Sequence, residues 1–256
     1  MESNKIYLLS DMGVMLGRSM RHVFRSMDTI LTVCITPIAM MLLFVYVFGG
    51  AIQTGTDHYV NYLLPGILLI AIASGVAYTA YRLFLDKQRG IIERFRTMPI
   101  ARSSVLWGHV LTSVVSNAIS LTVIILVALI IGFRSAVGMV PWLAVIGILV
   151  LFTLSLTWIA ALAGLTARTV EGASAFSYPL IFLPFISSAF VPTESMPTVV
   201  RVFADNQPVT PIVEAIRALL AGQSVGNEIW AALAWCIGIL IVSYVLAMRV
   251  FNRQSA

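Results

Sequence analysis

Six long windows of this 256-residue chain contain no Asp, Glu, Lys or Arg. A helix needs about 20 consecutive apolar residues to cross the roughly 30 Å hydrocarbon core of a bilayer, and each window is long enough to supply them. A soluble fold has no use for six such runs. The sequence therefore predicts an all-α membrane protein with six transmembrane helices, one in each of the windows Thr29–Thr56, His58–Tyr81, Ser103–Phe133, Ser135–Ala167, Gly172–Thr193 and Ile229–Met248.

The composition agrees with this prediction, because 59% of the residues are hydrophobic and 11% are charged, whereas a soluble domain carries about 25% charge. We expect three parts: an N-terminal cytoplasmic or interfacial helix (1–28), a six-helix transmembrane domain (29–250) and a cytoplasmic tail (251–256). Between Leu8 and Met27, apolar side chains fall on one side of a helical wheel and three arginines fall on the other. That pattern is typical of an amphipathic helix lying in the membrane interface.

The positive charges are distributed unevenly over the segments between the windows. Alternate sides of the membrane receive 13 and 3 of the 16 Lys and Arg residues. The positive-inside rule places the richer side in the cytoplasm, so both termini are expected there. Anionic lipid and insertion bias explain the net charge of +5, and no nucleic-acid partner is needed.

The second loop, residues 83–104, is the most distinctive cytoplasmic segment. Ile91, Phe95 and Met98 share one helical face, Arg89 and Glu93 form an i,i+4 pair on another, and Pro99 ends the pattern. A short helix with an apolar ridge and flanking charge suits docking into a groove of a partner protein. The alternative is a solvated loop that is basic only because of topology.

The fifth loop, residues 191–228, is long and expected on the outer side. Pro211 is placed to begin a helix and Gly222 to cap it, while Ile212, Ile216 and Leu219 face one way. Glu214 and Arg217 stand three apart, a spacing that allows them to pair. The segment is too short to span a membrane, and it predicts a partly re-entrant helix, with an ordinary surface helix as the alternative.

Within the windows, three prolines predict kinks, at Pro37, Pro179 and Pro184. Small residues at 160–164 and 71–75 predict close helix packing. The spans carry almost no ionisable group, so they lack the side chains that a proton relay across the membrane requires. We expect the passage to be lined by apolar and hydroxyl-bearing residues such as Thr112, Ser113, Ser116, Asn117 and Ser120.

Several kinds of chemistry are missing from the sequence. It has no G-x-x-x-x-G-K-[ST] phosphate loop and no Cys/His metal pattern. We therefore expect no catalytic, cofactor-binding or metal-binding residues in this chain. A hydrophobic or amphipathic substrate with an energy source outside the membrane fits best; an ion-coupled carrier and a non-transporting assembly or sensor subunit stay open.

The order of these parts resembles the membrane subunit of type-2 ABC exporters. The run ERFRTMPIAR (93–102) is similar to the coupling-helix segment of that family. The run FVPTESMPTVVRVFADNQPVTPIVEAIRALLAG (190–222) looks very like that of daunorubicin-resistance permeases.

The resemblance implies a permease of the bacterial plasma membrane that exports a drug, lipid or lipid-linked glycan. It implies a second permease copy or a related permease, and a separate cytosolic ATPase that binds ATP and Mg and does the hydrolysis. Residues that would contact the ATPase are Gly90, Ile91, Ile92, Glu93, Arg94, Phe95, Arg96, Thr97 and Pro99. Residues that would form the outer re-entrant helix or gate are Pro208, Thr210, Pro211, Glu214 and Arg217. The substrate-binding residues are not assigned.

Overall fold

The computed structural model describes residues 27–49, 59–91 and 102–253. The described residues are mostly helical and contain no strand. Within the described ranges, four helices are long and apolar enough to cross a membrane: α3 (Tyr59–Gln88), α5 (Arg102–Ile131), α6 (Met139–Thr166) and α11 (Glu228–Arg253). They lie in four of the six predicted windows and are candidate membrane spans.

The first and fifth predicted spans correspond to shorter apolar helices. The first is α2 (Met27–Leu43), which continues as the π-helix η1 (Phe44–Phe48). The fifth is divided into α7 (Val170–Ala175), α8 (Ser177–Phe182) and the 3₁₀ turn η2 (Leu183–Ile186). The count of six therefore stays a prediction.

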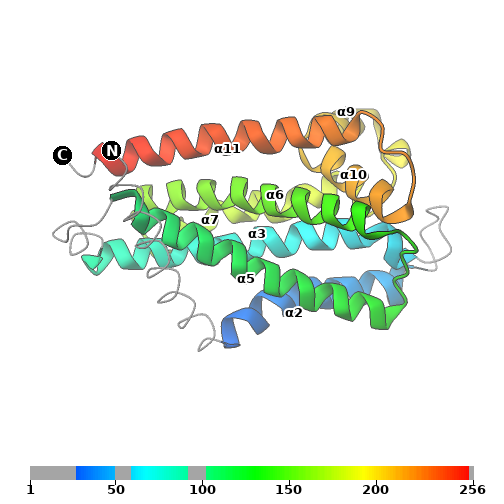
Figure 1. Ribbon diagram of the computed structural model, residues 1–256, viewed down its shortest axis with the longest axis horizontal. Coiled ribbons are helices and arrows are strands. Elements are labelled where there is room, and N and C mark those ends of the chain that lie inside the picture. Colours follow the sequence, from blue (N-terminus) through cyan, green and yellow to red (C-terminus); the bar gives the residue numbers. More distant parts are fainter. Residues whose placement is uncertain (1–26, 50–58, 92–101, 254–256) are drawn as a thin grey trace.

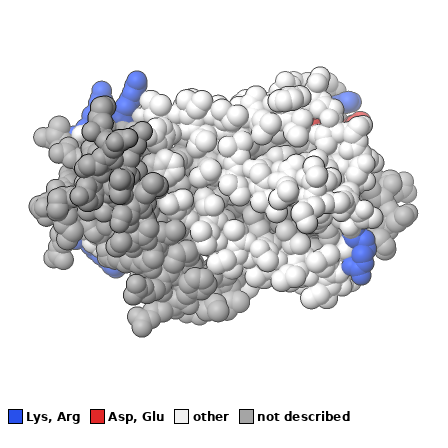
Figure 2. Space-filling model, in the orientation of Figure 1, with Lys and Arg blue, Asp and Glu red and all other residues white. Residues whose placement is uncertain are grey.

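The helix α3 lies in the middle of the bundle and packs against α2, α5, α6, α7 and α8 (Figure 1). The helix α11 packs mainly on α6, and α2 lies against α3 and α5. Among the described residues drawn in Figure 2, the charged side chains gather at the two ends, and the stretch between them carries none. One end holds Gln88 of α3 and Arg253 of α11 and is called the basic end below. The other holds α10 (Val209–Ala221) and is called the α10 end.

Small residues allow α3 to approach its neighbours closely, as the sequence predicted. A Cβ added at Gly164 of α6 would lie 2.7 Å from the carbonyl oxygen of Ala80 in α3. A Cβ at Gly66 of α3 would lie 2.6 Å from the Cβ of Ala189. Neither glycine has room for a larger side chain, because real Cβ atoms do not approach to these distances. Close packing of this kind is how helices associate in lipid, where no hydrophobic force draws them together.

Two of the three prolines predicted to cause kinks stand in the fifth segment, which is divided into short helices. Pro184 stands in the 3₁₀ turn η2, and Pro179 stands in the short helix α8, so the fifth segment is broken. Pro37 lies inside α2 without ending it, and the helix changes to π geometry only at Phe44.

The hydroxyl-bearing residues of α5 do not line an open passage in the single chain. Thr112, Ser113, Asn117 and Ser120 are buried, and Ser116 is partly buried. Thr79 of α3 donates to Ser113 at 2.9 Å, and the Ser113 and Thr157 hydroxyls are 3.2 Å apart. These side chains therefore join α3, α5 and α6, because a polar group in hydrocarbon needs a partner.

Candidate functional site at the α10 end

The helix α10 is apolar on one face and ends at a glycine. Its buried side chains include Ile212 and Ile216, as the sequence predicted, while Leu219 is partly buried. The helix begins at Val209, so Pro211 is not its first residue; the prediction was wrong by two positions, since Pro208 already has helical dihedrals. Gly222 has φ of 68°, and the amide of Gln223 donates to the Ala218 carbonyl at 2.9 Å. This left-handed cap is the one predicted from the sequence.

Arg217 fastens α10 to two other parts of the chain. Its Nε and Nη2 both donate to the carbonyl of Tyr62 in α3, each at 3.2 Å, and Nη2 donates to the carbonyl of Ser188 at 2.7 Å. The guanidinium also lies over the Tyr62 ring, 3.7 Å from its centroid. Charge-assisted hydrogen bonds and a cation–π contact in a poorly hydrated place make this a strong anchor.

The same short turn after η2, residues 187–190, is fixed from other sides. The Tyr59 hydroxyl of α3 donates to the Phe190 carbonyl at 2.9 Å. Gln207 donates to the Ile186 carbonyl at 2.8 Å, and Thr210 donates to the Ala204 carbonyl at 2.6 Å. The side chains of Tyr59, Gln207 and Arg217 thus hold the end of the fifth segment, whereas the Thr210 bond joins α10 to α9. A movement of α10 must therefore move this turn or break the Arg217 bond.

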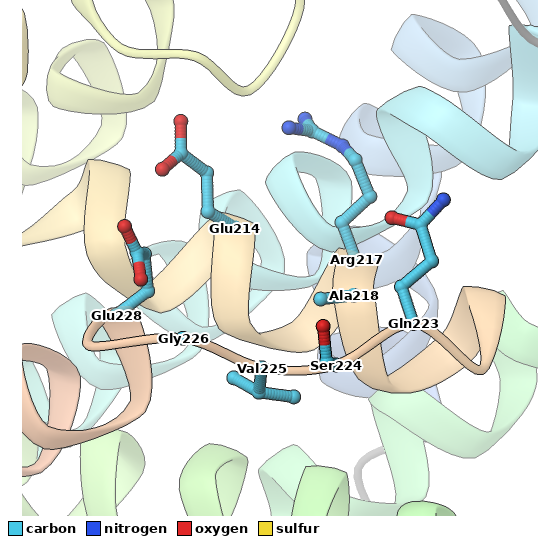
Figure 3. Close-up of a pocket in the computed structure, with 8 residues that line it drawn as sticks. All are labelled: Glu214, Arg217, Ala218, Gln223, Ser224, Val225, Gly226 and Glu228. Atoms are coloured by element: carbon cyan, nitrogen blue, oxygen red, sulfur yellow. The ribbon is translucent and has the colours of Figure 1, made fainter.

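A pocket of about 310 Å³ opens beside α10 and the start of α11 (Figure 3). Its charged lining residues are Glu214, Arg217 and Glu228, and Gln223 and Ser224 add polar groups. In Figure 3 the Glu214 and Arg217 side chains project from the same side of α10. Among the described residues no ion pair joins them, since the mapped hydrogen bonds of Arg217 go to carbonyl oxygens.

The environment changes the acid–base behaviour of both charged groups. Burial raises the pKa of Glu214, and the Ser188 hydroxyl and the Arg217 charge oppose that rise. Burial lowers the pKa of Arg217, and the neighbouring Tyr62 and Glu214 oppose that change. The pocket has room for a small polar or charged group.

The structure brings the predicted outer residues together at one corner: Pro208, Thr210, Pro211, Glu214 and Arg217 all belong to α10 or its cap. Sequence reasoning missed Tyr59, Tyr62 and Ser188 as partners of this corner. Two tyrosines three apart at the start of a span were a usable signal for a helix face, but nothing in the sequence paired them with Arg217.

The predicted ATPase contact lies mostly outside the described residues, which include Gly90 and Ile91 but not residues 92–101. Gly90 has φ of 67° and follows the end of α3. Next to this loop, His109 Nε2 of α5 lies 3.3 Å from Asp86 Oδ2 of α3, and Lys87 Nζ donates to the Leu165 carbonyl of α6. The two stems of the loop are therefore tied to each other and to α6.

The described part of the chain shows neither a metal-binding group nor a disulfide. No group of three or more His, Cys, Asp or Glu side chains there is placed to hold a metal ion. Cys34 and Cys236 are buried free thiols.

Comparison with known proteins decides the family. Residues 11–221 match the family described as ABC-2 type transporter. The chain belongs to the ABC-2 type transporter family. It is thus a multi-pass membrane permease, and its function is that of the membrane component of an ABC exporter for hydrophobic substrates.

Individual relatives agree with that family. The chain is 28% identical over 249 residues to "Daunorubicin resistance ABC transporter permease protein DrrB1" of Streptomyces coeruleorubidus, covering 93% of this chain and 87% of the relative. It is 27% identical over 235 residues to "Probable doxorubicin resistance ABC transporter permease protein DrrC" of Mycobacterium tuberculosis, covering 90% and 84%. It also matches "ABC transporter G family member 20" of Dictyostelium discoideum, 27% identical over 208 residues, which cover 78% of this chain and 28% of that protein.

Membership of the ABC-2 family has general consequences for assembly. Permeases of this family are non-catalytic, and they work as dimers with an ABC ATPase. The resemblance inferred from residues 93–102 and 190–222 is therefore confirmed at the level of the family.

Proposed function

We propose that this ABC-2 permease exports a hydrophobic or amphipathic drug across a bacterial plasma membrane, powered by a separate cytosolic ATPase. The names of the two bacterial relatives, which refer to daunorubicin and doxorubicin resistance, support a drug over a lipid or lipid-linked glycan as the substrate. The ATP and Mg would bind to the ATPase chain, and no cofactor would bind here.

The observation that carries this proposal is the absence of charge from the middle of the bundle in a member of this family. The charge-free windows leave no carboxylate in mid-membrane for ion coupling. The buried polar groups there, Thr79, Ser113 and Thr157, bond to one another. The free energy for transport must then enter from outside the membrane.

The orientation follows from the charge distribution. The basic end would face the cytoplasm, with both termini on that side, and the α10 end would face outward. The segment 1–28 would lie in the cytoplasmic interface, 29–250 would form the transmembrane domain and 251–256 a cytoplasmic tail. The segment from Gly90 to Pro99 would contact the ATPase.

The coupling would run through the loop stems to the outer corner. The Asp86–His109 and Lys87–Leu165 contacts give α3, α5 and α6 a common inner end. The other end of α3 carries Tyr59 and Tyr62, which hold the 187–190 turn and α10. A shift of α3 driven by ATP would therefore reach the outer gate, provided that ATP binds the two conformations with different affinity.

Charge reversal in the loop tests this proposal. The full chain and its ATPase are reconstituted in vesicles, and ATP-dependent export of daunorubicin is compared for wild type, Glu93→Arg and Glu171→Arg. Glu171 is an exposed acidic residue at the start of α7, near the basic end, and serves as the matched control. We expect Glu93→Arg to abolish export and Glu171→Arg to retain it.

Export by Glu93→Arg at the wild-type rate would refute the docking role. The rival function, an ion-coupled secondary carrier, predicts export driven by a proton gradient without ATP or the ATPase. A non-transporting subunit predicts ATPase binding with no export under any condition.

A further inference from the structure

Five phenylalanines, called the phenylalanine cluster below, meet where the first and fifth segments come together: Phe44, Phe48, Phe182, Phe185 and Phe190. The rings of Phe185 and Phe190 are stacked, with centroids 4.9 Å apart and planes 13° apart. Phe44 stacks on Phe190 at 4.7 Å and 24°. Offset stacking is one of the two arrangements that aromatic pairs prefer, and it presents a ring face to a further planar group.

Both segments that supply these rings depart from regular α-helix at this place. Phe44 and Phe48 bound the π-helix η1, and Phe185 lies in the 3₁₀ turn η2. π-helical turns are rare and occur often at functional sites. The irregular backbone turns ring faces toward each other across two segments that lie far apart in the sequence.

The outer members of the cluster are open while the inner members are fixed. Phe182 is 61% exposed and Phe48 is 42% exposed, whereas Phe190 is buried. Phe48 lies 5.5 Å from Phe44, and Phe182 lies 6.2 Å from Phe185, each ring centroid to ring centroid. The cluster thus has a stacked centre, and the accessible rings of Phe48 and Phe182 flank it with planes tilted by 43° and 48° to their neighbours.

The centre of the cluster belongs to the same turn that α10 holds. The Phe190 carbonyl accepts from Tyr59, and the Ser188 carbonyl accepts from Arg217. Ala189 packs against Gly66 of α3. Any molecule that changes the position of the Phe190 ring therefore acts on the residues that fasten α10.

We propose that the phenylalanine cluster binds the planar aromatic ring system of the exported substrate by stacking. The segments η1, α8 and η2 contain no Asp, Glu, Lys or Arg, so the part of the ligand bound here is uncharged. An added ring gains stacking energy on Phe48 or Phe182 that a lipid chain does not gain, because an alkyl chain has no quadrupole to align. The inference rests on the proposed export function and names the substrate class for it.

A photoreactive planar probe tests the site directly. The full chain with its ATPase is placed in lipid nanodiscs and labelled with 1-azidopyrene, and the labelled peptides are mapped by mass spectrometry. We expect label in residues 44–48 and 182–190. Excess pyrene suppresses it at least about fivefold, whereas perhydropyrene, which has the same carbon skeleton without the aromatic system, suppresses it less than about twofold.

Substitutions distinguish aromatic stacking from nonspecific hydrophobic binding. Loss of one aromatic pair changes affinity by about 2–10-fold, so Phe185→Leu and Phe48→Leu lower the specific labelling by that factor. Phe203→Leu is the control, since Phe203 of α9 (Thr198–Asn206) is an exposed aromatic residue outside the cluster. The variant Phe48→Leu changes a half-exposed ring and keeps the test valid if Phe185→Leu folds poorly.

Three results would overturn the proposal. Label spread evenly over the lipid-facing side of α11, or equal competition by pyrene and perhydropyrene, would mean partition into lipid only. Exclusion of the label together with disulfide-linked dimers of Phe182→Cys would mean that a second copy covers the cluster. Specific labelling without ATP-driven export would instead refute the export function and would still support the binding site.

Discussion

Replacing Arg217 is the sharpest test of how the α10 end is held together. The guanidinium supplies charged donors to two carbonyl oxygens, of Tyr62 and Ser188, and stacks on the Tyr62 ring. A hydrogen bond to a charged group contributes about 1.5–3 kcal/mol, and a desolvated cation–π contact adds about 1–2 kcal/mol. The cost of burying the charge offsets part of this sum, which leaves about 2–4 kcal/mol for Arg217→Ala.

The assay is thermal unfolding of the purified chain in detergent. With about 2–4 °C of midpoint per kcal/mol for a chain of this size, Arg217→Ala lowers Tm by about 5–12 °C. Arg217→Lys keeps the charge but cannot donate to both carbonyls while stacking, so about half of the loss is expected. A double-mutant cycle with Tyr62→Leu isolates the ring contact, with a coupling of about 1 kcal/mol.

The control is Arg201→Ala, which removes an exposed i,i+4 ion pair with Asp205 of 3.6 Å on α9. Exposed pairs contribute less than about 1 kcal/mol, so Tm changes by less than about 3 °C. The reasoning fails if Arg217→Ala unfolds within 2 °C of wild type by the same measurement, or if Arg217→Ala and Arg201→Ala are equally destabilised.

Three further variants test the packing and the buried polar groups. Gly164→Ala drives a methyl against the Ala80 carbonyl and costs about 1–3 kcal/mol in thermal unfolding. Gly147→Ala in the same helix has open space around it and is neutral or stabilising by up to about 1 kcal/mol. Equal midpoints for the two would contradict the close contact. Glu214→Gln raises Tm at pH 7, because burial raises the pKa of Glu214 and its ionised form therefore destabilises the folded state. The increase in Tm should vanish below the ordinary Glu pKa, where Glu214 is protonated in both the folded and the unfolded state. An increase that does not change with pH would exclude titration of Glu214 as its cause. Ser113→Ala leaves Thr79 and Thr157 without their shared partner and lowers the free energy of unfolding by about 1 kcal/mol in the same assay. An unchanged Tm would mean that these hydroxyls do not join the helices.

The long helices could be predicted from the sequence because lipid leaves the backbone few choices. A charge-free run inside hydrocarbon must form its own hydrogen bonds, so the windows around α3, α5, α6 and α11 were sufficient to locate them. The Gly222 cap and the breaks near Pro179 and Pro184 were also predictable, because each depends on the dihedral angles of one residue type.

The partners at the site could not be predicted, because they depend on tertiary placement. Arg217 and Tyr62 stand 155 residues apart, and no periodicity joins them. The spacing of Glu214 and Arg217 allowed an ion pair, but two carbonyl oxygens at the end of the fifth segment take the guanidinium instead. The residue types of α5 showed that its hydroxyl groups share one face of the helix. They did not show what that face contacts, because helical spacing is the same whether a face meets another helix or an open passage.

Vesicle transport with the two subunits supplied separately tests the central claim most directly. The chain is reconstituted alone, with its ATPase, and with an ATPase variant that binds but does not hydrolyse ATP, and daunorubicin movement is measured with and without ATP. Net movement that requires the chain, the active ATPase and ATP together is the expected result. Sustained movement by the chain alone, driven by an ion gradient, would contradict the account.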